Sequence, residues 1–190
     1  ITSNSDYLVE AKRLTDYLAN AYSDEENLLF YYTENGAGDV IVRKKEMYDG
    51  AVPSANSFMA NNLNYLGFLF DNQKWIKRGA AMAQLIEQAA TRYPVSFANW
   101  ARLILNLSEG FREITVVGKG HQNGIDQINK WYLPNKLIQG SEKGNHSFPF
   151  LNGKKESVET PIFYLCKKYS CQKPVDNLEE FKLILRLKPG

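Results

Sequence analysis

Residues 43–57 read RKKEMYDGAVPSANS and stand directly before a run of apolar residues with helical spacing. Pro53 and Ser54 are typical of a helix start, because proline fixes φ near the helical value and a serine oxygen accepts hydrogen bonds from unpaired amide groups. Gly50, shortly before them, allows a turn. The second half of the stretch therefore predicts a helix that begins near Ser54.

The first half of the stretch contains Arg43, Glu46 and Asp49, which helix-starting chemistry does not explain. They are either solvated charges or part of a buried, charge-paired loop that locks helices together. A functional interpretation is also open. A helix N-terminus presents unpaired donors and a partial positive charge, and a glutamate and an aspartate beside it can act as acid and base or accept hydrogen bonds from sugar hydroxyls.

The functional interpretation assigns a role to each side chain. Glu46 and Asp49 are the candidate catalytic residues, as acid or base. Aromatic rings are candidate stacking platforms for a sugar. The candidate ligand-binding residues are Arg43, Tyr48, Ser54, Asn56 and Trp100.

Apolar spacing predicts four helices in the first 110 residues. The first covers residues 6–22 and has one buried face, formed by Leu8, Ala11, Leu14, Leu18 and Ala21. The second follows Ser54, the third lies between Asn72 and Pro94, and the fourth lies between Ser96 and Gly110. Residues 28–33 and 39–42 predict a small β-hairpin between the first helix and the second.

The last third of the chain predicts a different architecture. Strands are expected over residues 113–117, 136–139 and 160–166, and helices over 123–132 and 177–187. The polar residues 140–160 are the best candidate for a mobile loop. This order is typical of a small α/β unit. We therefore divide the chain into helical hairpins over residues 1–110 and an α/β tail over residues 111–190, packed on them.

Two motifs resemble a known family. Residues 45–57, KEMYDGAVPSANS, resemble the pattern K-E-x-x-D-G-A-x-P-S-G-N-S of the YyaL-type proteins, which include the spermatogenesis-associated thioredoxin-like proteins. Residues 160–175, TPIFYLCKKYSCQKPV, resemble the closing pattern T-A-Y-x-C-x-x-x-x-C-x-x-P-V of that family. Ala55 departs from the pattern, which has glycine there. The resemblance covers essentially the whole chain, as the C-terminal part of a longer family member.

The resemblance implies an architecture and two candidate functions. Family members have an N-terminal thioredoxin-like domain followed by an (α/α)6 toroid, similar to N-acylglucosamine 2-epimerases and six-hairpin glycosidases. The expected fold is therefore mainly α, part of such a toroid, with a small α/β tail. By analogy of fold, the chain binds or acts on a carbohydrate or a related metabolite, as an epimerase-like or glycosidase-like enzyme. The alternative is a non-catalytic binding or scaffold module that serves a thioredoxin-like domain absent from this chain.

Cys166 and Cys171 are the only cysteines. Their C-x4-C spacing is neither the C-x-x-C of thioredoxin-type redox sites nor a strong zinc pattern. We expect two reduced thiols, with a local disulfide as the alternative, because five residues can return the second sulfur to bridging distance after a turn. No metal and no cofactor are expected.

Composition limits the expected partners. The net charge is +2 and the basic residues are spread along the chain, so a concentrated basic face for nucleic acid is not expected. No apolar run is long enough for a membrane-spanning helix, and no signal peptide is apparent, which predicts a cytoplasmic protein. The chain lacks an initiator methionine, so a missing N-terminal part is an expected partner. A second copy of the chain is another expected partner, because it could cover an exposed apolar face.

Overall fold

The computed structural model describes residues 3–38, 40–144, 148–168 and 170–186. The chain divides into two compact units. Residues Ser5–Ser108 form the helical unit, and Ile1–Asn4 together with Glu109–Gly190 form the sheet unit.

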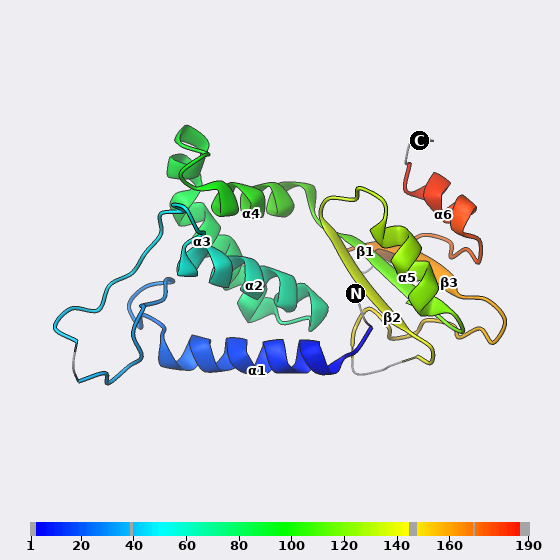
Figure 1. The fold of residues 1–190 in the computed structure, drawn as a ribbon, viewed down its shortest axis with the longest axis horizontal. Coiled ribbons are helices and arrows are strands. Elements are labelled where there is room, and N and C mark those ends of the chain that lie inside the picture. Colours follow the sequence, from blue (N-terminus) through cyan, green and yellow to red (C-terminus); the bar gives the residue numbers. More distant parts are fainter. Residues whose placement is uncertain (1–2, 39, 145–147, 169, 187–190) are drawn as a thin grey trace. The chain divides into compact units, whose positions relative to one another are not determined.

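The helical unit contains four helices: α1 (Asp6–Ala21), α2 (Ala55–Leu69), α3 (Gln73–Arg92) and α4 (Ala98–Glu109). Figure 1 shows α2 and α3 as neighbours joined by a short turn. The predicted start of α2 is confirmed, because the Ser54 side chain accepts a hydrogen bond from the Ser57 backbone amide. Asn72 begins α3 in the same way, through the amide of Trp75.

Two predictions for the first 60 residues are wrong. The helix predicted over residues 6–22 is observed as α1, but its predicted buried face is wrong at Leu14, which is 46% exposed, and the buried residue of α1 is Thr15. The expected hairpin is also absent from the described residues, since residues 28–33 and 40–42 form no strand and Asp39 lies outside the described part. Instead, Phe30 pairs with Ser23 in an isolated bridge. Side chains of other elements hold this segment through hydrogen bonds, and a local sequence pattern does not indicate such contacts.

Helices α2 and α3 approach each other closely at Gly79, which is buried in α3. A β-carbon at this position would lie 2.9 Å from the backbone oxygen of Ala60 and 3.2 Å from the backbone nitrogen of Asn64, both in α2. Only glycine fits without moving one helix. The pair of helices therefore depends on a small residue at one position.

The sheet unit is built on a four-stranded mixed sheet in the order β2-β1-β3-β4. Its strands are β1 (Arg112–Val117), β2 (Lys136–Ser141), β3 (Ile162–Lys167) and β4 (Ser170–Cys171). Strand β2 is parallel to β1 and is joined to it through α5 (His121–Asn129). Strand β3 is antiparallel to both β1 and β4. Residues 145–147 of the expected mobile loop lie outside the described residues.

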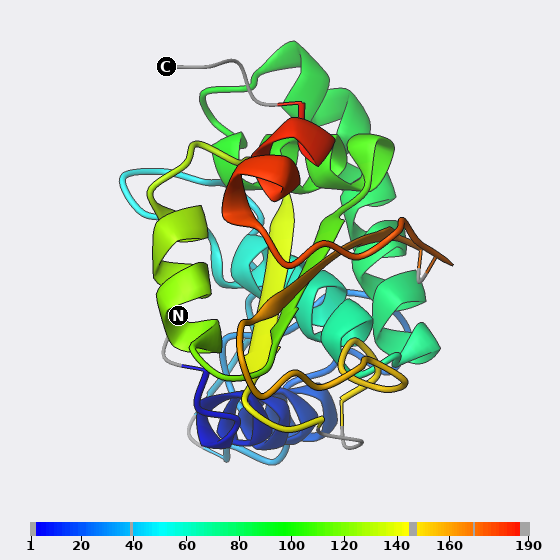
Figure 2. The same ribbon diagram turned by 90° about the vertical axis from the view of Figure 1, so that its right-hand side faces the viewer.

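Two helices cover one face of this sheet (Figure 2). They are α5 and the C-terminal α6 (Leu178–Ile184). Ile114 and Val116 of β1 and Phe163 of β3 point to this face and form a buried core with Ile125, Ile128 and Phe181 of the two helices. The opposite face carries Glu113, Thr115, Tyr164 and Cys166, all of them buried.

The expected fold class is wrong. The chain has an α/β fold with a four-stranded mixed sheet, and the expected toroid part is not observed. Four successive helices fit a toroid segment, but they fit many other helical arrangements equally well, because helical spacing reports a buried face and not its partner. The toroid was implied by the family resemblance alone.

We expect Gly79→Ala to lower the free energy of unfolding by about 1–3 kcal/mol, because the added methyl group must push α2 and α3 apart. Chemical denaturation measures the change. Lys77→Ala is the control in the same helix, since Lys77 is exposed and its change is expected to stay within about 0.5 kcal/mol. Equal stability of the two variants would contradict the close approach of the helices.

Candidate functional site

The carboxylate of Asp49 accepts hydrogen bonds from four donors. Its Oδ1 accepts from the Ser54 backbone amide at 2.8 Å and from the Ser57 hydroxyl at 2.7 Å. Its Oδ2 accepts from the backbone amides of Asn99 at 2.9 Å and Trp100 at 3.3 Å. The residue is 4% exposed. A buried charge is tolerated when hydrogen bonds replace its hydration, and here both oxygens are used.

These donors belong to the first turns of two helices. Ser54 and Ser57 lie at the start of α2, and Asn99 and Trp100 lie at the start of α4. The first amide groups of a helix have no partner within the helix, and the helix dipole favours a negative charge there. Asp49 therefore binds the two helix starts together. Its own amide donates to the Ser96 carbonyl at 2.9 Å, which fixes the loop before α4 as well.

Two asparagines that the sequence did not indicate extend this network. The Asn99 side-chain amide donates to the Ser57 hydroxyl oxygen at 2.9 Å. The Asn61 amide donates to the carbonyls of Ser57 at 2.8 Å and Asn99 at 3.2 Å. Their only signal in the sequence is their position near a predicted helix start, which is weak because asparagine is common there. Their role depends on α2 and α4 being neighbours.

Asn56, a predicted ligand-binding residue, is 1% exposed and bound to backbone groups. Its Oδ1 accepts from the Phe30 amide at 2.7 Å, and its Nδ2 donates to the carbonyls of Phe30 and Glu46, each at 2.9 Å. The side chain therefore joins two loop segments to the start of α2. It replaces the hairpin pairing that the sequence predicted for residues 28–33.

Arg43 and Lys45 enclose one aromatic ring. The Arg43 guanidinium carbon lies 3.9 Å and the Lys45 Nζ 4.8 Å from the centroid of Tyr31. Arg43 also donates to the Thr33 carbonyl at 2.6 Å, and Lys45 forms an ion pair with Asp24. The hydrogen bond from Lys45 lowers the pKa of the Asp24 carboxyl. Both cations therefore fasten residues 43–45 to the segment before them.

The remaining predicted site residues differ in exposure. Trp100 is fully buried and donates its indole N–H to the Met47 carbonyl at 2.8 Å, so its ring offers no face to a ligand in this structure. Tyr48 is 55% exposed and meets the edge of the Phe97 ring. Glu46 is exposed, and its Oε1 accepts from the amides of Met47 and Tyr48. Glu46 and Tyr48 are thus the exposed residues of the predicted carbohydrate site.

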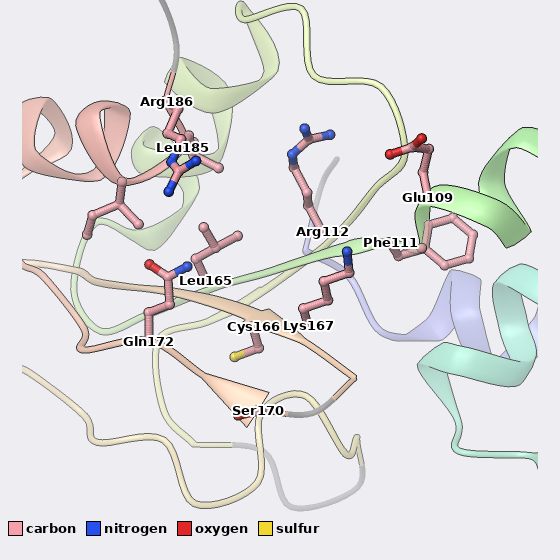
Figure 3. A pocket seen from close by; sticks show the side chains of 12 residues that line it. Glu109, Phe111, Arg112, Leu165, Cys166, Lys167, Ser170, Gln172, Leu185 and Arg186 are labelled. Atoms are coloured by element: carbon pink, nitrogen blue, oxygen red, sulfur yellow. The ribbon is translucent and has the colours of Figure 1, made fainter.

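The sheet unit contains a separate cleft of about 270 Å³ (Figure 3). Leu165 and Gln172 point into the space below Leu185 and Arg186, whereas the Cys166 sulfur points to the other side of its strand. The cleft has three basic residues in its lining, Arg112, Lys167 and Arg186. The sequence did not indicate it, because its walls come from three distant segments.

Cys166 and Cys171 form a disulfide, so the expectation of two reduced thiols is wrong and the alternative holds. The reason is the register of β3 and β4, in which these two residues are direct partners. The Lys154 Nζ lies 2.7 Å from the Cys171 sulfur and 3.5 Å from the Cys166 sulfur. Sequence spacing did not indicate Lys154.

Within the described residues, no group of three or more His, Cys, Asp and Glu side chains is arranged to hold a metal ion. Within the same residues, no helix combines the length and apolar character that a membrane crossing requires.

Asp49→Asn is expected to lower the free energy of unfolding by about 3 kcal/mol, because an amide NH₂ would replace one acceptor and face buried N–H donors. Chemical denaturation measures the loss. The matched control is Glu46→Gln, which also changes a carboxylate to an amide three residues earlier. Glutamine keeps the Oε1 acceptor at an exposed position, so we expect a change within about 0.5 kcal/mol. Similar losses in both variants would contradict the role given to Asp49.

The chain is similar in sequence to known proteins. No protein-family model matches the chain. The chain is 24% identical to spermatogenesis-associated protein 20 of Rattus norvegicus and 25% identical to that of Homo sapiens, in each case over 97% of this chain and 25% of the relative. An uncharacterized protein of Caenorhabditis elegans is 24% identical over 80% of the chain and 22% of its own length.

The chain thus spans about a quarter of the length of the curated relatives that it matches. The names of these relatives state no activity. The family relationship that the two motifs predict is confirmed, since over 97% of its length the chain is a homologue of spermatogenesis-associated protein 20.

Proposed function

We propose that the helical unit is a non-catalytic binding and scaffold module within a longer polypeptide. The observation that carries this proposal is the saturation of the Asp49 carboxylate by four donors from two helix starts. A general acid or base must reach a substrate proton within hydrogen-bond distance. Asp49 is 4% exposed and has both oxygens occupied, which favours a structural role.

The neighbouring motif residues support the same proposal. Ser54, Asn56 and Trp100 are buried and engaged with other parts of the helical unit. Their polar groups are bound to backbone atoms, so a ligand would have to displace existing hydrogen bonds. Because these polar groups are satisfied within the protein, a role in folding is sufficient to explain why the three residues are present.

The partner that we propose is the part of a longer polypeptide outside this chain, including the thioredoxin-like domain that the family resemblance implies. The relatives are several times longer than the matched segment, which supports a partner in the same polypeptide. Helix α1 exposes Tyr7 and Leu14, at 69% and 46%, on one side because they are seven residues apart. Apolar side chains on one helix face are typical of a surface that another segment covers.

A carbohydrate ligand stays the second candidate, because Glu46 and Tyr48 are adjacent and exposed. A carboxylate and an exposed ring can bind hydroxyl groups and the apolar face of a sugar. The absence of a nucleic-acid or membrane partner stays a prediction from composition. The cytoplasmic location likewise stays a prediction.

Thermal unfolding against a panel of sugars and sugar phosphates separates the two candidates. For a scaffold module we expect no change in the unfolding midpoint. A ligand at about 100 times its dissociation constant would instead stabilise the chain by about 2.7 kcal/mol. A raised midpoint that disappears in Glu46→Gln would overturn the proposal and support a carbohydrate site at this loop.

The double substitution Tyr7→Glu/Leu14→Glu tests the proposed partner. Both side chains are exposed, so each change is expected to alter the stability of this chain by less than about 0.5 kcal/mol. Co-purification of this chain with the rest of the longer polypeptide, expressed as a separate chain, is expected to fall at least tenfold. Asn20→Glu, also exposed on α1, is the control for added charge. Unchanged co-purification of the double variant would exclude this face as the contact.

A further inference from the structure

Strand register places three reactive side chains in one row across the sheet. Glu113 of β1 is the direct partner of Cys166 in β3, and Cys166 is the direct partner of Cys171 in β4. Direct partners in neighbouring strands project to the same face of a sheet. The disulfide therefore shares its face with a buried carboxylate, on the side of the sheet opposite α5 and α6.

The two sulfur-bearing residues differ in exposure. Cys166 is 5% exposed, whereas Cys171 lies at the exposed edge strand. An incoming thiolate must approach the sulfur that it attacks, and it must displace the other one. Exposure therefore selects Cys171 as the attacked sulfur and Cys166 as the leaving one.

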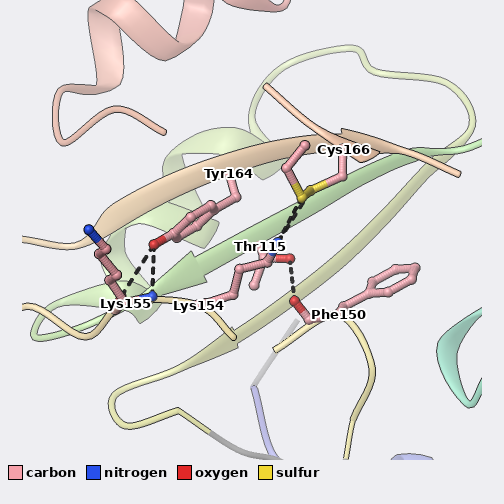
Figure 4. Close-up of a disulfide and its surroundings, with 7 residues drawn as sticks. Thr115, Phe150, Lys154, Lys155, Tyr164 and Cys166 are labelled. Carbon is pink, nitrogen blue, oxygen red and sulfur yellow. Dashed lines mark hydrogen bonds between the residues drawn. A yellow bond between two sulfur atoms is a disulfide. The ribbon is translucent and has the colours of Figure 1, made fainter. Parts of the chain in front are cut away.

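The side chain of Lys154 lies beside the disulfide (Figure 4). The Lys154 Nζ lies within 3.5 Å of both sulfurs and 4.8 Å from the centroid of the Tyr164 ring. A cation beside a cysteine favours its thiolate, while it gains little from a neutral disulfide sulfur. Burial lowers the pKa of Lys154, and the Glu113 charge acts against this shift. The lysine therefore stabilises the reduced pair more than the disulfide.

The hairpin that carries the disulfide is also held by other bonds. The Gln172 amide donates to the Leu165 carbonyl at 2.9 Å, and Phe163 and Val175 exchange backbone hydrogen bonds of 2.7 and 3.1 Å. Strand β3 and the segment that follows β4 therefore keep contacts that do not need the S–S bond. This allows the disulfide to open and close while the sheet unit stays folded.

We propose that Cys166 and Cys171 form a thiol–disulfide exchange site that takes a dithiol as its substrate, with Lys154 holding the leaving thiolate. A thiolate of the dithiol attacks the Cys171 sulfur, and the electron pair of the broken S–S bond leaves on the Cys166 sulfur. The second thiol of the dithiol then attacks its own mixed disulfide and releases Cys171. Two electrons pass to the protein and the dithiol becomes a disulfide. One of its two protons goes to a cysteine and the other to water, while Lys154 keeps one thiolate unprotonated.

The first experiment measures the reduction of the whole chain by dithiothreitol, with alkylation and mass spectrometry to count free thiols. The site predicts full and reversible conversion, with an unchanged far-ultraviolet circular dichroism spectrum in the reduced form. Loss of the folded spectrum on reduction would overturn the proposal, because the disulfide would then be a structural brace.

Lys154→Met tests the lysine. We expect reduction by dithiothreitol to slow about tenfold, and the reduced-to-oxidised ratio at fixed dithiothreitol potential to fall about tenfold, because one charge next to the leaving thiolate is lost. Lys155→Met is the matched control at the next residue. The Lys155 side chain is exposed, and its hydrogen bonds with Tyr164 are made by backbone atoms. Lys154→Arg keeps the charge and is expected to restore most of the rate. Equal rates for Lys154→Met and Lys155→Met would overturn the role of Lys154.

Single cysteine variants test which sulfur reacts. With bis(2-hydroxyethyl) disulfide as an uncharged probe, Cys166→Ser leaves Cys171 free and is expected to form a mixed disulfide. Cys171→Ser leaves the buried Cys166, and we expect it to react at least tenfold more slowly. The opposite order, or equal rates, would contradict the assignment of Cys171 as the attacked sulfur.

Discussion

The carboxylate of Asp49 is the constraint on which the helical unit depends. Two helices that begin side by side bring two sets of unpaired amide groups and two positive dipole ends into one buried place. Without an anion there, the amides would stay unsatisfied and the dipole ends would repel each other. The Asp49 carboxylate meets both requirements, because its negative charge faces the dipole ends and its two oxygens accept hydrogen bonds from four donors. The position of α4 relative to α2 therefore follows from a side chain that belongs to neither helix.

Much of the local structure could be predicted from the sequence. Pro53 and Ser54 predicted the start of α2, and the β-branched run at residues 113–117 predicted β1. These signals depend on groups a few residues apart, which the chain itself brings together. The helix predicted over residues 6–22 is confirmed as α1, whereas the predicted burial of Leu14 and the predicted strand at residues 28–33 were wrong, because both depend on distant partners. The backbone of Phe30 forms hydrogen bonds with the side chain of Asn56, twenty-six residues away. The spacing of apolar residues does not indicate such a contact.

The candidate sites were predicted in part. The sequence identified Asp49, Cys166 and Cys171 as notable, but their chemistry depends on tertiary neighbours. A C-x4-C spacing is compatible with free thiols or a disulfide, and strand register decides between them. Lys154 lies twelve residues before Cys166 and approaches the sulfurs only after the chain has turned back along the sheet. The toroid was expected from analogy with a family, and an analogy carries no information about the hydrogen bonds of this chain.

Glu46 and Asp49 show why a motif alone does not establish a reaction. They have the same functional group and are three residues apart, yet one is exposed and the other is enclosed by donors. Chemical type therefore does not distinguish them, whereas their hydrogen-bond partners do. Three residues of the stretch 45–57 have a role in folding: Asp49 is an acceptor and Ser54 a cap at helix starts, and Asn56 binds the carbonyls of two loop segments. The hydrogen bonds of these residues give them a role without any ligand, so evidence for catalysis has to come from groups that a substrate can reach.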